Sequence, residues 1–254
     1  MLNCLFPFTR SGAFLLVCAT LLASVFSTHG ETTAFENGVA AYEARDFAGA
    51  AKFFEADINR APSAEAWRNL GNAEWQGEHP GLAVLAWERA LWINPSDADA
   101  AASLRYARQT AQLAELPLRW WETFSVWLPP NAWAGLGAAS FWLTVLLVLV
   151  LPVILGWRKS AWTQSLAAVA FGVFLLTLAG AAGVHSRTAI GVVLWPATPL
   201  RQTPTHHAQI LTQLAAGEMV RCRNIHGNYY LLRTSTGDWG WVEKKQLQLI
   251  SRPE

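Results

Sequence analysis

Two apolar stretches on either side of a short basic loop decide the architecture: WAGLGAASFWLTVLLVLVLPVIL (133–155), GWRKS (156–160) and AWTQSLAAVAFGVFLLTLAGAAGV (161–184). Neither apolar stretch contains Asp, Glu, Lys, Arg or His. At about 1.5 Å per residue, a helix over either stretch is long enough to cross the hydrocarbon core of a bilayer. The pattern therefore predicts a transmembrane hairpin, which we interpret as an anchor because an ion path would need ionisable groups at depth.

The charges around the hairpin predict its orientation. Arg158 and Lys159 in the short loop favour the cytoplasmic side. Independently, Arg10 followed by the apolar run 12–28 is typical of a secretory signal peptide, which we expect at 1–30. An uncleaved anchor is the alternative, and both interpretations place residue 31 onward outside the cytoplasm. We therefore expect a bacterial inner-membrane protein with both flanking domains on the periplasmic side.

The segment 116–132, just before the hairpin, is rich in tryptophan. Indole rings favour the interface between lipid and water, so Trp120, Trp121 and Trp127 predict an interfacial segment. A tether without a specific role remains the alternative.

Residues 31–115 contain an internal repeat with a period of 33 residues. Gly38 recurs as Gly71, Ala50 as Ala83, Phe54 as Trp87, and Pro62 as Pro95. Each unit reads as two helices that approach at the small residues and end at the proline. The pattern resembles the tetratricopeptide repeat, with 97–113 as a capping helix, although Asn37 and Asp57 depart from it in the first unit.

The tetratricopeptide resemblance implies a concave groove that binds protein partners. Carried over position by position, the groove contains Tyr42, Glu43, Arg68, Asn72, Trp75, Arg105 and Arg108. Arg68 and Asn72 lie one helical turn apart and could hold an acidic or carboxylate-terminated peptide. Solvated side chains without a ligand are the alternative.

Beyond residue 185 the apolar pattern changes from helical to alternating, which predicts strands. We expect five, at 189–195, 210–214, 219–222, 229–233 and 239–242. Their order, with Gly240-Trp241-Val242 as the sharpest motif, resembles a bacterial SH3-like barrel over 188–254. Its candidate binding surface is an aromatic strip of Tyr229, Tyr230 and Trp239, although alternation predicts that one residue of each neighbouring pair is core.

The other residues that could be reactive do not indicate a metal site or a catalytic nucleophile. His206 and His207 are adjacent on a loop and lack further ligands, so we predict no metal or other cofactor. Cys222 alternates with Val220 and is predicted to be core rather than a nucleophile. Residues 31–115 have a net charge of −6 and residues 185–254 of +4. Neither is basic enough for a nucleic-acid footprint, so no nucleic-acid partner is expected.

The full order of segments is similar to that of the BatE family of aerotolerance-operon proteins of Gram-negative bacteria. The predicted fold class is multidomain: an all-α tetratricopeptide-repeat solenoid, a two-helix transmembrane hairpin and an all-β SH3-like barrel. The resemblance implies a non-enzymatic scaffold for other proteins, including membrane proteins with von Willebrand factor A domains, in envelope or oxidative-stress maintenance. The alternatives are a peptidoglycan-binding module and, without a Cys–His or metal cluster to support it, a cell-wall hydrolase.

Overall fold

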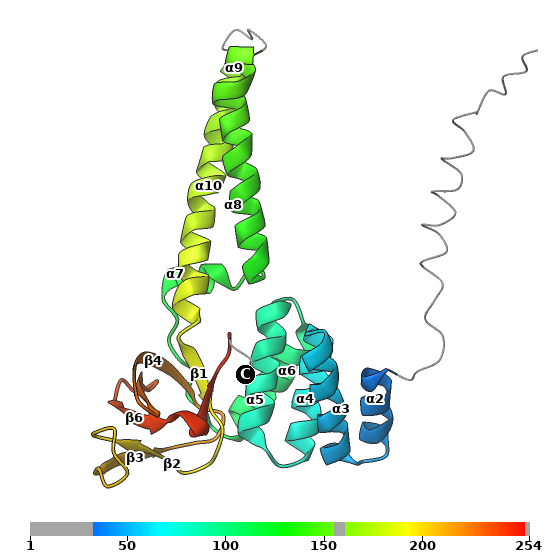
Figure 1. The fold of residues 1–254 in the computed structure, drawn as a ribbon, viewed down its shortest axis with the longest axis vertical. Coiled ribbons are helices and arrows are strands. Elements are labelled where there is room, and N and C mark those ends of the chain that lie inside the picture. The colour runs from blue at the N-terminus through cyan, green and yellow to red at the C-terminus, as the bar shows by residue number, and fades with distance from the viewer. Residues whose placement is uncertain (1–32, 155–160, 252–254) are drawn as a thin grey trace, which may run out of the picture. The chain divides into compact units, whose positions relative to one another are not determined.

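The computed structural model describes residues 33–154 and 161–251. In these residues the α-helices come first and end at Arg187, and strands with one 3-10 turn (Lys244–Gln246) follow (Figure 1). The predicted signal peptide at 1–30 and the predicted cytoplasmic loop at 156–160 lie outside the described residues.

The repeat region consists of two helical hairpins and one further helix. Its elements are α2 (Ala34–Glu43), α3 (Phe47–Arg60), α4 (Ala64–Gln76), α5 (Pro80–Ile93) and α6 (Ala98–Thr110). The repeated glycines lie where the helices cross. A Cβ on Gly38 would come within 2.7 Å of the Phe54 ring, and one on Gly71 within 2.6 Å of the Trp87 ring. Each glycine therefore makes room for the aromatic residue of the next helix.

Side-chain caps begin three of these helices. Asp46, Ser63 and Asp97 accept hydrogen bonds from the backbone N–H groups of Gly49, Ala66 and Ala100, at 2.9, 3.1 and 3.0 Å. Such caps satisfy N–H groups that have no partner within the helix. They explain why the helices begin where they do.

A short helix, α7 (Trp120–Ser125), leads into two long apolar helices. The first consists of α8 (Pro130–Val145), a π-helical turn (Leu146–Val150) and α9 (Leu151–Ile154), and the second is α10 (Ala161–Arg187). In the described chain, these are the two helices long and apolar enough to cross a membrane, at Pro130–Val153 and Ala161–Arg187. This finding points to membrane association.

The two long helices pack side by side (Figure 1). Trp133 of α8 lies against Gly180 of α10, where a Cβ would overlap the indole ring. Many of their other large apolar side chains are exposed, as at Leu149 (58% exposed) and Val153 (79%). An apolar surface of this kind is suited to a lipid environment rather than water.

Seven strands of the described chain form one antiparallel sheet in the order β3-β2-β6-β5-β4-β1-β7. They are β1 (Ile190–Val193), β2 (Thr198–Arg201), β3 (Ile210–Leu214), β4 (Met219–His226), β5 (Tyr229–Arg233), β6 (Trp239–Glu243) and β7 (Leu247–Leu249). The prediction of five strands is therefore wrong. It missed β2, which contains Pro199, and β7, which has only three residues.

The helical hairpins and the sheet share one hydrophobic core. Ile190, Val192, Leu194, Met219 and Ile250 from the sheet region cluster with the buried residues of α3 to α6. On α5, residues 83–87 are all buried, because one face packs on α4 and another meets β1. The repeat region and the sheet are therefore one structural body.

Candidate functional site

Aromatic side chains form a pocket on the repeat helices, here called the Trp75 pocket. Its volume is about 380 Å³, and it is lined by Tyr42, Asn72, Trp75, Gln76, Trp87, Ala102, Ser103 and Tyr106. The Trp75 ring lies 5.8 Å from the Trp87 ring and 5.9 Å from the Tyr106 ring. Three of the predicted groove residues, Tyr42, Asn72 and Trp75, therefore line one pocket.

The predicted pair of Arg68 and Asn72 is already engaged within the chain. Arg68 donates a 3.0 Å hydrogen bond to the carboxylate of Asp97, and its guanidinium also lies 3.8 Å from Glu65. The Asn72 side-chain oxygen accepts a 3.0 Å hydrogen bond from the Trp87 indole. Both side chains stabilise the packing of the helices.

Tyr106 is a pocket residue that the sequence analysis missed. The 33-residue period points to Arg105 as the successor of Asn72, but α6 starts after Asp97, 34 positions after the N-cap Ser63, so the successor of Asn72 is Tyr106. One extra residue rotates a helix face by about 100°. Tyr106 therefore faces the pocket. Of the remaining predicted groove residues, Glu43 and Arg105 are exposed on the surface, and neither lines the pocket.

The predicted aromatic strip on the sheet is divided between different environments. Tyr229 is buried, and its ring lies 5.8 Å from that of His206. Tyr230 is half-buried, beneath the Lys244 ammonium at 5.8 Å from the ring centre. Trp239 is 46% exposed, with the Arg233 guanidinium 5.8 Å from its ring. Trp239 is thus the most accessible member of the strip.

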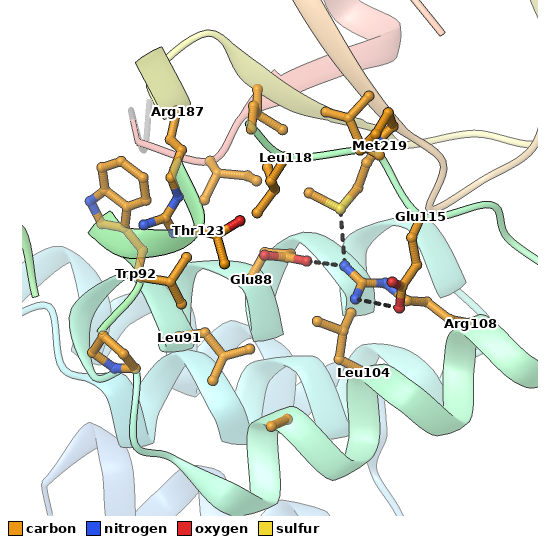
Figure 2. A pocket seen from close by; sticks show the side chains of 17 residues that line it. Glu88, Leu91, Trp92, Leu104, Arg108, Glu115, Leu118, Thr123, Arg187 and Met219 are labelled. Carbon is orange, nitrogen blue, oxygen red and sulfur yellow. Dashed lines mark hydrogen bonds and ion pairs between the residues drawn. The ribbon is translucent and has the colours of Figure 1, made fainter. Parts of the chain in front are cut away.

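A second cavity lies where the repeat region, the sheet, α7 and the end of α10 meet; we call it the junction cavity (Figure 2). Its volume is about 530 Å³. Its wall includes residues from α5, α6, α7, the end of α10, β1 and β4: Glu88, Leu91, Trp92, Pro95, Ala101, Leu104, Arg108, Glu115, Leu116, Pro117, Leu118, Thr123, Val126, Arg187, Ile190, Met219 and Ile250. No element of the chain builds this cavity alone, so its existence depends on the shared core.

An ion pair lies on one side of the junction cavity, where Arg108 bonds to Glu88 (Figure 2). Arg108 also lies 3.6 Å from Glu115 and 3.0 Å from the Met219 sulfur. Burial raises the pKa of Glu88, and Arg108 only partly offsets this effect. Arg108, predicted for the partner groove, therefore joins the repeat region to the sheet.

Arg187, the last residue of α10, occupies the other side of the cavity. Its guanidinium lies 4.8 Å from the centre of the Trp92 ring (Figure 2). It also donates a 3.4 Å hydrogen bond to the Ser125 hydroxyl. Among the described residues, no carboxylate stands at ion-pair distance from it. Arg187 thus differs from Arg108, which has two.

Glu122 of α7 links three parts of the chain and has no exposed side-chain surface. Its two oxygens accept hydrogen bonds from Arg221 of β4, at 2.6 and 2.9 Å. Ser186 of α10 and the Arg119 backbone N–H also donate to it. Although burial acts to raise the pKa of Glu122, these donors outweigh it and lower the pKa to about 2. A lone acid within a tryptophan-rich segment was the signal that could have indicated a buried partner.

Two observations on the described residues concern metal binding and the reactivity of the cysteine. Within 33–154 and 161–251, no group of three or more His, Cys, Asp or Glu is arranged to hold a metal ion. Cys222 is half-buried against the sheet core, and burial raises the pKa of its thiol to about 12. Its thiolate, the reactive form, is therefore scarce at neutral pH.

No protein-family model matches the chain, and no curated protein matches it.

Proposed function

We propose that the chain is a non-enzymatic scaffold of the bacterial inner membrane that binds other proteins on the periplasmic side. The observation that carries the proposal is the Trp75 pocket. It is open to solvent, it is lined by helices of both hairpins and by α6, and Tyr106 at its edge is 60% exposed. Exposed tyrosine and tryptophan with little conformational freedom are characteristic of protein-binding surfaces.

The anchoring of this pocket supports a scaffold role. The repeat region shares its core with the sheet, and Glu122 ties the sheet to α7 and α10. A partner bound in the Trp75 pocket would be held at a fixed place relative to the membrane helices. Preorganisation of this kind lowers the entropic cost of assembling a complex.

For the partner, we propose a membrane protein with a von Willebrand factor A domain. This choice follows the similarity in segment order to the BatE family. In that assignment the helical hairpins act as tetratricopeptide-type repeats and the sheet as an SH3-like domain, in a complex for envelope or oxidative-stress maintenance.

Site-specific photo-crosslinking in native membranes tests this proposal. A photoreactive phenylalanine at position 106 is expected to crosslink a protein with a von Willebrand factor A domain, identified by mass spectrometry. The same probe at Lys52, an exposed residue of α3 outside the pocket, is the control. Trp75→Ala should abolish the crosslink, and Asn72→Ala should weaken it. Equal adducts from positions 106 and 52 would refute the proposed surface.

Peptidoglycan binding by the sheet is a second candidate, favoured by the exposed Trp239 ring beside Arg233. Sedimentation of the full chain with purified murein tests it. Retention that is lost in Trp239→Ala and kept in Trp75→Ala would support this candidate. Absence of retention would exclude it without affecting the crosslinking result.

A further inference from the structure

The junction cavity combines an apolar wall with one cation, Arg187, that has no carboxylate at ion-pair distance among the described residues. Leu91, Leu104, Ile190 and Ile250 line it, and its volume of about 530 Å³ lies within the range of sites for small ligands. A cavity with this lining is suited to a molecule with an apolar chain.

Arg187 gives the cavity a preference for a ligand with an anionic group. Its ring contact with Trp92 and its single long hydrogen bond to Ser125 hold the guanidinium in place. Neither contact neutralises its charge. A carboxylate or phosphate could accept two parallel hydrogen bonds from the guanidinium, an arrangement that arginine is well suited to make.

The carboxylates of the cavity are in contact with a different cation. Glu88 and Glu115 both form ion pairs with Arg108, and Glu88 acts on Arg187 only electrostatically, from beyond ion-pair distance (Figure 2). A ligand with two anionic groups would meet Glu88 or Glu115, whereas a ligand with one anionic group at Arg187 avoids them.

The position of the cavity indicates where such a ligand comes from. Arg187 ends the candidate membrane span Ala161–Arg187, and Thr123 and Val126 of α7 also line the cavity. On α7 and just after it, Trp120 and Trp127 are 71% and 73% exposed, as expected for rings at the surface of a bilayer. The cavity therefore lies close to the headgroups of the lipid layer.

We propose that the junction cavity binds one anionic amphiphile, with its phosphate or carboxylate on Arg187 and its apolar chain against Leu91, Leu104 and Ile250. A phospholipid of the bilayer and a free fatty acid share this chemistry. The ligand fills the space between the repeat region, the sheet and α10.

Native mass spectrometry of the delipidated full chain in detergent tests the proposal. The probes are dioleoyl phosphatidylglycerol, oleate and dioleoylglycerol, which has the same chains as the phospholipid but no anionic group. We expect a one-to-one adduct with phosphatidylglycerol or with oleate, and the stronger of the two identifies the source of the ligand. Dioleoylglycerol should bind at least tenfold more weakly, about the effect of one charge-assisted hydrogen bond.

Three variants assign the adduct to the cavity. Arg187→Gln should weaken binding at least tenfold, and Ala101→Leu, which fills the wall of the cavity, should reduce binding of both anionic probes. Arg105→Gln is the matched control, because Arg105 lies on the same helix as Ala101 and is exposed outside the cavity. Equal uptake by the parent and both cavity variants would overturn the proposal, as would equal binding of dioleoylglycerol.

Discussion

Two glutamates lie near the end of α10, Glu122 fully buried and Glu88 with a side chain that is 12% exposed, but the protein surrounds them with different numbers of hydrogen-bond donors. Glu122 accepts hydrogen bonds from Arg221, Ser186 and the Arg119 backbone, and its pKa falls to about 2. Glu88 bonds to Arg108 beside a cavity, and its pKa rises. Burial by itself raises the pKa of an acid, so the number of hydrogen-bond donors decides whether the pKa of each glutamate rises or falls.

The contrast distinguishes a structural joint from a site with room for a ligand. A carboxylate with a full set of donors fixes α7, α10 and β4 to one another. Around Glu88, packing is incomplete, since about 530 Å³ remains open beside it. The hydrogen bonds of Glu122 thus fix the end of α10 to the sheet, whereas the junction cavity beside Glu88 leaves room for a ligand.

The largest effect is expected from Glu122→Gln. The variant leaves the buried Arg221 guanidinium without a countercharge, which should lower the free energy of unfolding by about 3–5 kcal/mol. Thermal unfolding in detergent, followed by circular dichroism, measures the change. Glu115→Gln is the control, because the Glu115 side chain is 75% exposed and should shift stability by about 0.5 kcal/mol or less. A Glu122→Gln variant as stable as the parent would show that the joint is not structural.

The next largest effect is expected in the pH dependence of stability that the Glu122–Arg221 pair produces. The folded-state pKa of Glu122, about 2, lies below its ordinary value of 4.5, so ionised Glu122 stabilises the fold above pH 4.5. This stabilisation, about 3 kcal/mol, is lost as the pH falls from 4.5 towards 2. The stability difference between parent and Glu122→Gln should therefore shrink over that interval. A stability difference between parent and variant that stays constant between pH 2 and 7 would contradict a pKa of about 2 for Glu122.

A smaller effect is expected at the contact between α5 and the sheet region. A Cβ on Gly81 would overlap the backbone carbonyl of Leu194, so Gly81→Ala should cost about 1–3 kcal/mol and loosen the shared core. Limited proteolysis of the segment between α6 and α7 reports the loosening. In the control Gly135→Ala, the new Cβ meets no atom within 4 Å, and the cleavage rate should not change.

The smallest effect is expected from Glu88→Gln. The substitution loses an ion pair, but Arg108 keeps Glu115 at 3.6 Å, and the carboxylate that is removed is one whose ionised form is disfavoured by burial. The net change should therefore be within about 1 kcal/mol at pH 7. Because the pKa of Glu88 is raised, its ionisation costs stability as the pH rises through the folded-state value. The parent should therefore lose stability relative to Glu88→Gln as the pH increases, opposite to the trend for Glu122. If the stability of the parent relative to each variant changed with pH in the same direction for Glu88→Gln and Glu122→Gln, the contrast between the two glutamates would be wrong.

The elements of the fold were largely readable from local patterns. The pairing of Gly71 with Trp87 appeared as a 33-residue period, and the strands at 210–214 and 229–233 have the predicted bounds. These features depend on neighbours close in the chain. β2 and β7 escaped prediction because one contains proline and the other is too short to show alternation.

Contacts between residues far apart in the chain could not be predicted from local sequence patterns. The unbroken apolar run Leu82–Trp87 on α5 was the one signal of a helix buried on two faces. Nothing in the chain near Glu122 indicates Arg221 as its partner, 99 positions away. The junction cavity depends on such contacts, and for this reason Arg187 could not be predicted as part of a site.

The repeat region and the sheet share one hydrophobic core and form one body beside the two long apolar helices. A distance measurement between spin labels on genetically encoded residues at Lys52 and Arg223, both exposed, tests this claim in lipid nanodiscs. We predict a single narrow distribution of distances in the parent protein, broadened by Gly81→Ala. A broad distribution in the parent, or one with several populations, would contradict the shared core.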